Sequence, residues 1–258
     1  MDLFGLAGRS ALVTGGNGGI GLAVARGLQR AGAQVAVMGR DPDKNAAAAD
    51  VLGEHALVLE GDVTDEAAVD QATASVVSAL GGLHILVNNA GGFRGGPLTQ
   101  LSVSNWRAVL DSHLTGAFLC TKHAVPHLVA AGGGKVVNIA SVYSHYGTPD
   151  FADYGAAKAG LLGLTRSLAV ELAPDNIQVN ALALGWYETD LTRGMPGDLI
   201  EQIRRKTPAG RWGELDDVVG PAVFLSSRAS DFVTGVALAV DGGYLVSDRF
   251  SPQPCGPG

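Results

Sequence analysis

The feature that most constrains the fold is a series of short apolar runs that alternate with helical patterns along the chain. Each run has four to seven residues, nearly all apolar, which is typical of strands covered on both faces. The predicted strands are residues 11–14, 34–38, 56–60, 83–87, 135–140, 177–183 and 236–240. Strand–helix alternation of this kind predicts an α/β fold, in which a doubly wound parallel sheet of about seven strands is wrapped by helices on both faces.

Composition favours one globular domain. The chain has 258 residues, of which 47% are apolar and 17% charged, and it shows no internal repeat and no Pro/Ser-rich linker. We expect a single domain over residues 1–250 and a flexible, Pro- and Gly-rich tail over residues 251–258. The net charge of −7 argues against nucleic acid or an anionic membrane as the main partner.

Location is predicted from what the sequence lacks. The uncharged span 71–93 is long enough to cross a bilayer, but its Gln, Ser, Thr, His, Asn and Gly residues indicate helix, turn, strand and loop. No secretion signal opens the chain. Two cysteines, Cys120 and Cys255, provide no disulfide framework and suit a reducing compartment. We therefore expect a cytoplasmic protein with no membrane partner.

A glycine string ends the first predicted strand. The letters TGGNGGIG at residues 14–21 run directly into an amphipathic helical pattern that Gly32 closes. Glycines at a strand-to-helix turn let the backbone approach a pyrophosphate, and the helix N-terminus supplies N–H donors. The string predicts a dinucleotide site whose residues are Gly15, Asn17, Gly18, Gly19, Ile20 and Gly21.

The end of the second predicted strand bears on which dinucleotide binds. An acidic residue is expected there when a ribose 2′-hydroxyl is bound, but the chain has Gly39 followed by Arg40. Gly39 leaves room, and the Arg40 guanidinium suits a 2′-phosphate, so NADP(H) is favoured. NAD(H) remains possible, because an arginine here can instead stack on adenine and because Asp41 comes next.

A tyrosine and a lysine stand one turn apart in the segment ADYGAAKAG, residues 152–160. Tyr154 and Lys158 are four residues apart and share one helix face, either as a surface pair or as a reactive pair. A phenol titrates near ~10, and bringing its pKa to about 7 requires roughly 4 kcal/mol. One ammonium ~4 Å away supplies roughly that much at an effective dielectric of about 20. Lys158 is therefore about sufficient to make Tyr154 a proton donor and acceptor near neutral pH.

Together these motifs resemble the short-chain dehydrogenase/reductase family, in its single-domain type of about 250 residues. The resemblance runs from Leu6 to Tyr244 and rests on the motifs TGGNGGIG, GDV at 61–63, NNAG at 88–91, Ser141, YGAAK at 154–158, VNALALGWYETD at 179–190 and VDGGY at 240–244. It implies a Rossmann-type fold. Within the family, MGRDPDKNAAAA is most similar to sugar-acid dehydrogenases such as gluconate 5-dehydrogenases, followed by 3-oxoacyl-carrier-protein reductases.

The resemblance also implies roles for further residues. Asp62 and Val63 would bind adenine, Asn89, Ala90 and Gly91 would line the cofactor, and Gly185, Tyr187 and Thr189 would contact the nicotinamide carboxamide. Lys158 would also bind the nicotinamide ribose, next to Tyr154. Hydride would pass between nicotinamide C4 and a ketone or secondary alcohol, Ser141 would hydrogen-bond the substrate oxygen, and Tyr154 would exchange the proton.

Two positions depart from the family pattern. His113 stands where an asparagine usually anchors a water chain to the lysine, and it either serves in that relay and titrates near neutral pH or merely fills space. Leu184 stands where a proline usually precedes Gly185, so the sequence does not fix the course of the backbone over the nicotinamide.

The remaining expectations concern substrate, metal and assembly. An NADP(H)-preferring oxidoreductase is favoured, and the alternatives are a non-catalytic redox sensor or an NAD-dependent sugar-acid or sugar-alcohol dehydrogenase. The segment 186–213 is either a surface excursion or a substrate lid, and the resemblance favours a lid. The candidate pocket side chains leave both a small polar keto or hydroxy compound and a bulkier ketone possible; they are Phe93, Arg94, Tyr143, His145, Tyr146, Phe151, Trp186, Tyr187 and Met195. No metal is expected, because His123 and His127 lack a third ligand. Helices over 105–131 and 152–172 are expected to pair in a homodimer or homotetramer.

Overall fold

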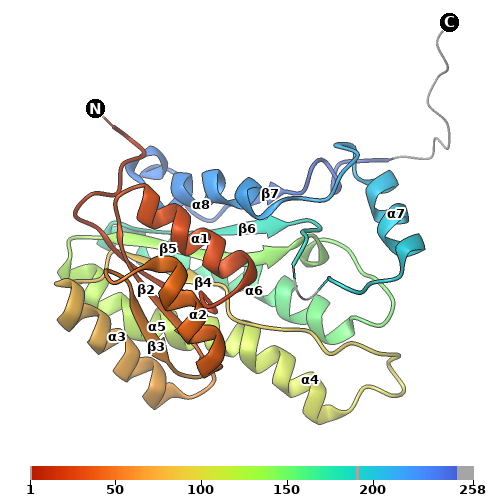
Figure 1. Cartoon of the computed structure of the whole chain (residues 1–258), viewed down its shortest axis with the longest axis horizontal. Helices are drawn as coiled ribbons and strands as arrows, with labels where there is room; N and C mark the ends of the chain where they lie inside the picture. The colour runs from red at the N-terminus through yellow and green to blue at the C-terminus, as the bar shows by residue number, and fades with distance from the viewer. Residues whose placement is uncertain (1, 190–191, 249–258) are drawn as a thin grey trace, which may run out of the picture.

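The computed structural model describes residues 2–189 and 192–248. A parallel sheet of seven strands forms its centre, in the order β3-β2-β1-β4-β5-β6-β7 (Figure 1). The strands are β1 (Ser10–Thr14), β2 (Gln34–Gly39), β3 (Leu57–Glu60), β4 (Ile85–Asn88), β5 (Gly134–Ser141), β6 (Ile177–Leu184) and β7 (Ala237–Val240). This topology confirms the predicted Rossmann-type α/β fold in a single domain, and every predicted strand is present within about two residues of its expected bounds.

Helices cover both faces of the sheet, with the two hydrophobic layers between them (Figure 1). One layer is packed by α1 (Gly19–Arg30), α2 (Pro42–Leu52) and α8 (Val219–Ser226). The other is packed by α3 (Glu66–Leu80), α5 (Gly116–Ala130) and α6 (Ala152–Leu172). The sheet positions are nearly all apolar because a parallel strand is buried on both faces.

β5 and β6 are the longest strands and extend beyond β4 at the carboxyl edge of the sheet. The register pairs Asn88 at the end of β4 with Asn138, whereas β5 and β6 stay paired until Ser141 lies opposite Leu184. Because β6 continues in regular register through Leu184, the usual proline is not needed for the chain to reach Gly185. Ligands in open α/β sheets bind at this carboxyl edge.

The helix expected over 105–131 is interrupted. It consists of α4 (Val103–Leu110), a π-helical turn η1 (Asp111–Thr115) and α5, and His113 lies at the centre of the π-helical turn. Single π-helical turns are uncommon and occur frequently at functional sites.

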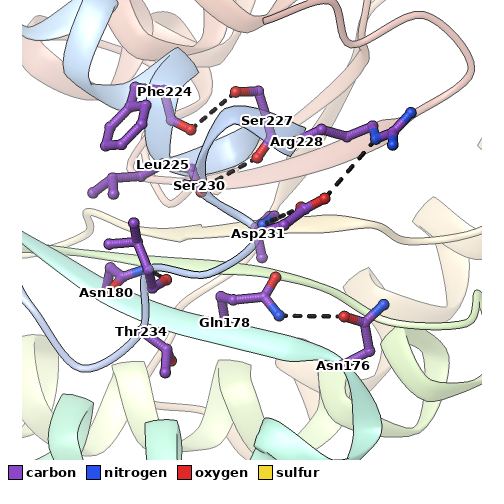
Figure 2. A network of polar contacts seen from close by, with 12 residues as sticks. Asn176, Gln178, Asn180, Phe224, Leu225, Ser227, Arg228, Ser230, Asp231 and Thr234 are labelled. Carbon is purple, nitrogen blue, oxygen red and sulfur yellow. Dashed lines mark hydrogen bonds and ion pairs between the residues drawn. The ribbon is translucent and has the colours of Figure 1, made fainter. Parts of the chain in front are cut away.

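A polar network fastens the segment before β7 to β6 and β5. Asn180 donates to the Val233 carbonyl at 2.8 Å and accepts from the Val236 N–H at 3.2 Å. The buried Lys135 ammonium donates to Asp231 at 2.8 Å. Figure 2 shows Asp231 facing Arg228 on one side of this segment, and the pair of Gln178 and Asn176 on the strand below it.

Candidate active site

The glycine string forms an open, uncapped helix start after β1. No side chain caps the N-terminus of α1, and no acidic residue lies in its first turn. A Cβ on Gly21 would lie 2.3 Å from the Gly15 carbonyl oxygen, whereas a Cβ on Gly18 would meet nothing within 4 Å. The loop is therefore closely packed at Gly21, whereas at Gly18 it is open. These free N–H groups and the missing side chains fit a dinucleotide pyrophosphate.

Asn17 fills the space beside Gly39, which differs from the expectation that this glycine leaves room for the cofactor. A Cβ on Gly39 would lie 2.1 Å from the Asn17 amide nitrogen. That amide donates to Asn45 at 2.8 Å, and Asn45 donates to the Gly39 carbonyl at 3.0 Å. Gly39 thus lets the Asn17 side chain pack against β2. Ile20, also in the glycine string, is partly buried and packs against the hydrophobic core.

Arg40 and Asp62 form an ion pair at the mouth of the predicted adenosine site. The guanidinium donates to the Asp62 carboxylate at 3.1 Å, and Thr64 donates to the same carboxylate from its N–H and its hydroxyl. Although burial opposes it, these bonds and the Arg40 charge lower the pKa of Asp62. The neighbouring Asp41 carboxylate is used elsewhere, because it accepts from the N–H groups of Asp43 and Lys44 at the start of α2.

Thr14 links the end of β1 to the loop after β4. Its hydroxyl accepts the N–H groups of Asn89 and Ala90 at 3.0 and 3.1 Å. The Asn89 amide donates to the Thr14 and Gly15 carbonyls, so this side chain holds the glycine loop in place. Thr14 was not among the predicted site residues, although it directly precedes the first glycine of the string.

Ser141, Tyr154 and Lys158 meet at the carboxyl end of β5. Ser141 is the last residue of the strand, and α6 brings Tyr154 and Lys158 to the same place. Tyr154 hydrogen-bonds Ser141, and the Lys158 ammonium lies 5.5 Å from the centre of the Tyr154 ring. Lys158 is buried and donates to the Ile139 carbonyl, in the part of β5 that extends beyond β4. The structure therefore brings the three predicted residues together.

The electrostatics of this cluster differ from the expectation. Burial raises the pKa of the Tyr154 phenol, and the hydrogen bond with Ser141 offsets only part of that effect. Burial also lowers the pKa of Lys158 to about 7. The expectation that Lys158 alone lowers the phenol pKa is therefore wrong for the protein without cofactor, because desolvation weakens the positive charge that the argument assumed.

His113 packs against Tyr154. Its ring lies edge to face with Tyr154 at 5.2 Å between centres, and its Nε2 lies 2.7 Å from the Gly92 carbonyl oxygen. Burial and the Lys158 charge lower the pKa of His113 to about 3, which contradicts titration near neutral pH, one part of the two alternatives that the sequence left open. The ring is neutral, Nε2 carries the proton that Gly92 accepts, and Nδ1 is a buried acceptor without a partner.

Gly91 makes room for that histidine. Its φ is +152°, and a Cβ there would lie 2.0 Å from the His113 ring. On the far side, Val63 fills the space over Gly116, the first residue of α5. Gly91 and Val63 thus lie on either side of the π-helical turn.

A small cavity of about 10 Å³ lies beside Lys158 and His113, close to the volume needed for one water molecule. The polar residues that line it are Thr14, Asn88, Ser112, His113 and Lys158. Two buried acceptors among them, the Asn88 Oδ1 and the His113 Nδ1, lack a hydrogen-bond partner. The cavity is therefore polar and adjoins the amine of Lys158.

The three predicted cofactor residues after β6, Gly185, Tyr187 and Thr189, have different surroundings. Gly185 lies against Asp241, and the Thr189 methyl group would be the nearest contact of a Cβ on Gly19, so Thr189 reaches the glycine loop. The Tyr187 side chain points away, because its hydroxyl donates to the Val240 carbonyl at 3.0 Å and its ring packs on Gly213. The Tyr187 side chain is thus held by these contacts, at the border of a cavity of about 340 Å³ that Trp186, Trp212 and Asp241 also line.

The substrate side of the cluster is aromatic. Tyr143 lies 6.1 Å from Tyr154, 5.7 Å from Phe151 and 5.8 Å from Trp186 between ring centres. Phe151 also contacts Phe93 at 5.5 Å. The helix α7 (Gly197–Lys206) lies beyond the carboxyl ends of β5 and β6 (Figure 1), and its Ile203 packs with Val142, Trp212 and Tyr244. Met195 is partly buried in this cluster, whereas His145 and Arg94 are exposed.

Other candidate sites are reported for the described residues only. His123 lies between Glu66 and Asp70 at 3.2 and 3.0 Å, and no group of three metal-ligating side chains occurs in residues 2–189 and 192–248. Within the same ranges, no helix is both long and apolar enough to cross a bilayer. Residues 251–258, the predicted tail, lie outside the described part of the chain.

The glycine cradle, the tyrosine–lysine–serine cluster and the sheet topology define an oxidoreductase that acts on a CH–OH group with NAD(P). The sequence matches the family described as enoyl-(acyl carrier protein) reductase over residues 15–245. The chain belongs to the short-chain dehydrogenase/reductase family.

Individual relatives are similar along nearly their whole length. The chain is 40% identical to gluconate 5-dehydrogenase of Gluconobacter oxydans over 251 residues, which cover 95% of this chain and 98% of the relative. It is 42% identical to cis-4-hydroxycyclohexanecarboxylate dehydrogenase of Sinomonas cyclohexanicum, with 92% and 97% covered. The crystal structure of a gluconate 5-dehydrogenase from Burkholderia cenocepacia in complex with NADP and tartrate superposes with a TM-score of 0.91 at 39% identity, with 95% and 98% covered.

Proposed function

We propose that this protein is an NADP(H)-preferring oxidoreductase that interconverts a ketone and a secondary alcohol, with Ser141, Tyr154 and Lys158 as its catalytic residues. The observation that carries the proposal is the meeting of these three side chains at the carboxyl end of β5, beside the glycine cradle. A non-catalytic redox sensor could use Lys158 to bind the cofactor, but it would not need the Tyr154 hydroxyl beside Ser141.

The cofactor supplies hydride exchange at nicotinamide C4 when bound. The open α1 terminus would hold its pyrophosphate, Asp62 and Val63 its adenine, and the loop from Asn89 to Gly91 its central part. Thr189 and the main chain of Gly185 and Tyr187 would contact the carboxamide. Lys158 would bind the nicotinamide ribose, and Tyr154 would lie against it.

The protein residues handle the substrate oxygen and its proton. Ser141 orients the oxygen by a hydrogen bond, and the Tyr154 hydroxyl gives up or takes the proton. Because burial raises the pKa of Tyr154 and lowers that of Lys158 in the protein alone, the phenol becomes acidic only when further positive charge approaches it. An oxidised nicotinamide would supply such a charge for alcohol oxidation, whereas in ketone reduction the protonated phenol is the form that donates.

His113 would extend the proton path as a neutral acceptor. It adjoins the same small cavity as Lys158, and its free Nδ1 offers a lone pair to a proton carrier there. Its Nε2 bond to Gly92 fixes the tautomer that keeps this lone pair available.

Preference for NADP(H) is supported by the groups at the end of β2. Arg40 is mostly exposed and pairs only with Asp62, so its guanidinium can turn to a 2′-phosphate. Asp41 does not oppose that phosphate directly, since its carboxylate caps α2. The similar structure from Burkholderia cenocepacia holds NADP.

The substrate class is supported by the relatives. Two of them are named for a hydroxy acid, one an open-chain sugar acid and the other a carbocyclic acid. A small hydroxy or oxo acid is therefore the first compound to test, and an NAD-dependent sugar-acid dehydrogenase is the second candidate.

Assembly and location complete the proposal. Phe118 and Val129 on α5 and Val170 on α6 are exposed apolar side chains, which suits a homodimer or homotetramer formed through these helices. Cys120 is a buried free thiol, in keeping with a cytoplasmic protein. Light scattering would test the first statement and cell fractionation the second.

Turnover of NADPH with a panel of ketones tests the function as a whole. Wild-type protein is expected to consume NADPH with at least one small oxo acid, and Tyr154→Phe is expected not to. If no ketone in a broad panel is reduced, although NADPH binds, the proposal fails.

A further inference from the structure

Lys206, the last residue of α7, holds its ammonium between two aromatic rings. The nitrogen lies 4.1 Å from the centre of the Tyr244 ring and 4.8 Å from that of Tyr146. Among the described residues it makes no hydrogen bond and no ion pair. Its neighbours Arg204 and Arg205, in contrast, both bind the Glu201 carboxylate.

The two rings continue inward to the catalytic tyrosine. Tyr146 lies 5.4 Å from Tyr143, and Tyr143 lies 6.1 Å from Tyr154, in each case nearly perpendicular. We call Tyr143, Tyr146 and Tyr244 the aromatic wall. Lys206 thus lies at the outer end of this wall, and the hydroxyl that exchanges the proton lies at its inner end.

Among residues 2–189 and 192–248, no acidic side chain forms an ion pair with this ammonium. The Asp241 carboxylate accepts the N–H groups of Gly243 and Leu245, both at 2.8 Å. A lysine over ring faces is attracted to them, yet its N–H donors remain available for an anion. The charge of Lys206 is therefore free to bind an anionic ligand at the wall.

A second unsatisfied donor lies beside the wall. The Trp186 indole Nε1 is buried and has no hydrogen-bond partner, and its ring meets that of Tyr143 at 5.8 Å. A buried donor without an acceptor is destabilising, so an oxygen atom of a ligand would be stabilised there. The rest of the wall presents apolar ring faces together with the hydroxyls of its three tyrosines.

We propose that the substrate is an oxo- or hydroxycarboxylate with a compact apolar body, and that Lys206 binds its carboxylate. This inference rests on the proposed function. The reacting oxygen lies at Ser141 and Tyr154, the body lies along the aromatic wall, and the carboxylate lies at Lys206. An open-chain polyol would instead place several hydroxyls against ring faces that offer them few partners.

A matched pair of substrates tests the charge. The wild-type protein with NADPH is given 4-oxocyclohexanecarboxylate and, separately, 4-oxocyclohexanecarboxamide, which has the same shape and no charge. We expect kcat/KM to be at least about tenfold higher for the acid, as one charged hydrogen bond provides. Lys206→Met should bring this ratio close to one, mainly through KM, whereas Lys206→Arg should keep most of it.

The controls separate anchoring from packing. Methionine still covers the rings, so a lysine that only packs there would leave the ratio unchanged in Lys206→Met. Arg205→Met removes the same charge one residue away and should keep the wild-type ratio. Cyclohexanecarboxylate, which does not react, should inhibit wild type at least about tenfold more tightly than Lys206→Met.

Three results would overturn the inference. The first is an acid-to-amide ratio that Lys206→Met leaves intact. The second is a wild-type protein that reduces other ketones but prefers neither cyclohexane compound over 5-keto-gluconate. The third is an acid-to-amide ratio of kcat/KM that also falls close to one in Arg205→Met, which would indicate that the overall positive charge of α7 favours the acid, and not a specific contact with Lys206. Absence of turnover with every ketone, with NADPH binding retained, would instead contradict the proposed function.

Discussion

Lys158 places its ammonium 5.5 Å from the centre of the Tyr154 ring, while it donates a hydrogen bond to the Ile139 carbonyl. The main chain of β5 thus fixes the amine, and the amine lies against the phenol without bonding to it. Because the pKa of this lysine is lowered to about 7, its charge at neutral pH is only partial. In the proposed reaction, ionisation of the Tyr154 phenol would therefore need a second positive charge beside it, such as that of an oxidised nicotinamide.

Removal of the phenol oxygen should abolish turnover without loss of the cofactor. Tyr154→Phe is expected to lower kcat by roughly 10²–10⁴-fold, the contribution of a positioned acid or base. The dissociation constant for NADPH, measured by fluorescence titration, should change less than about threefold, since the glycine cradle is intact. A variant that is folded and retains near-wild-type kcat would show that another group transfers the proton.

Burial of Lys158 should make stability depend on pH. Its pKa falls from 10.5 to about 7 on folding, so between these values the unfolded chain binds a proton that the folded chain does not. Through this residue the free energy of unfolding rises with pH, by up to about 1.4 kcal/mol per pH unit. Lys158→Met should therefore have a higher free energy of unfolding than wild type, measured by urea unfolding. This difference should be largest near pH 7 and below and should shrink towards pH 10.

A lysine far from the site provides the control for that experiment. Lys44 on α2 is exposed, and Lys44→Met should show the same dependence of stability on pH as wild type. A Lys158→Met difference that stays constant from pH 6 to 10 would show that the ammonium is not desolvated.

His113 should affect rate without adding a titration. His113→Leu removes the Nδ1 acceptor and is expected to lower kcat by about tenfold, whereas His113→Asn keeps a polar side chain and should retain more activity. Because the pKa of His113 is about 3, neither variant should remove a step between pH 5 and 8 from the pH–rate profile. Equal kcat in wild type and His113→Leu would reduce this residue to a packing role.

Arg40 should determine the choice of cofactor. Arg40→Ala is expected to weaken NADPH binding by roughly 10–100-fold, the value of one charged hydrogen-bonded contact, and to leave NADH nearly unaffected. Measured Kd values for both cofactors give the answer directly. Wild-type protein that binds NADH as tightly as NADPH would contradict the assigned preference.

The ion pair between the buried Lys135, near the start of β5, and the exposed Asp231 should contribute to stability alone. Asp231→Ala leaves the Lys135 ammonium, only 9% exposed, without its partner, and is expected to cost about 1–3 kcal/mol in urea unfolding. Arg228 meets the same carboxylate at 3.9 Å on the exposed side, so Arg228→Ala should cost less than about 1 kcal/mol. Equal losses in the two variants would mean that the burial of Lys135 is unimportant.

The sheet and the cluster of Ser141, Tyr154 and Lys158 were predictable because each depends on local sequence. Short, mostly apolar runs such as residues 135–140, in alternation with helical patterns, favour buried parallel strands. The spacing of Tyr154 and Lys158 fixes their common helix face. Ser141 follows from the place where its strand ends.

Other features depend on distant partners, and the sequence pattern did not reveal them. The π-helical turn at His113 accommodates a ring that packs against Gly91, 22 residues earlier. Tyr187 is turned by its bond to Val240, and Lys206 is placed by rings from two loops. The pKa of Tyr154 was misjudged because desolvation depends on the whole fold.

Because β5 is longer than β4, the residues proposed for proton transfer and those proposed for substrate binding stand on different parts of the structure. Ser141 and the carbonyl that holds Lys158 both belong to the part of β5 that runs past β4, where a paired ladder makes the backbone stiff. Lys206 and the rings around it stand on loops and on a short outer helix. On the proposed function, substitutions in these outer parts would change which molecule is accepted and would leave Ser141, Tyr154 and Lys158 in place.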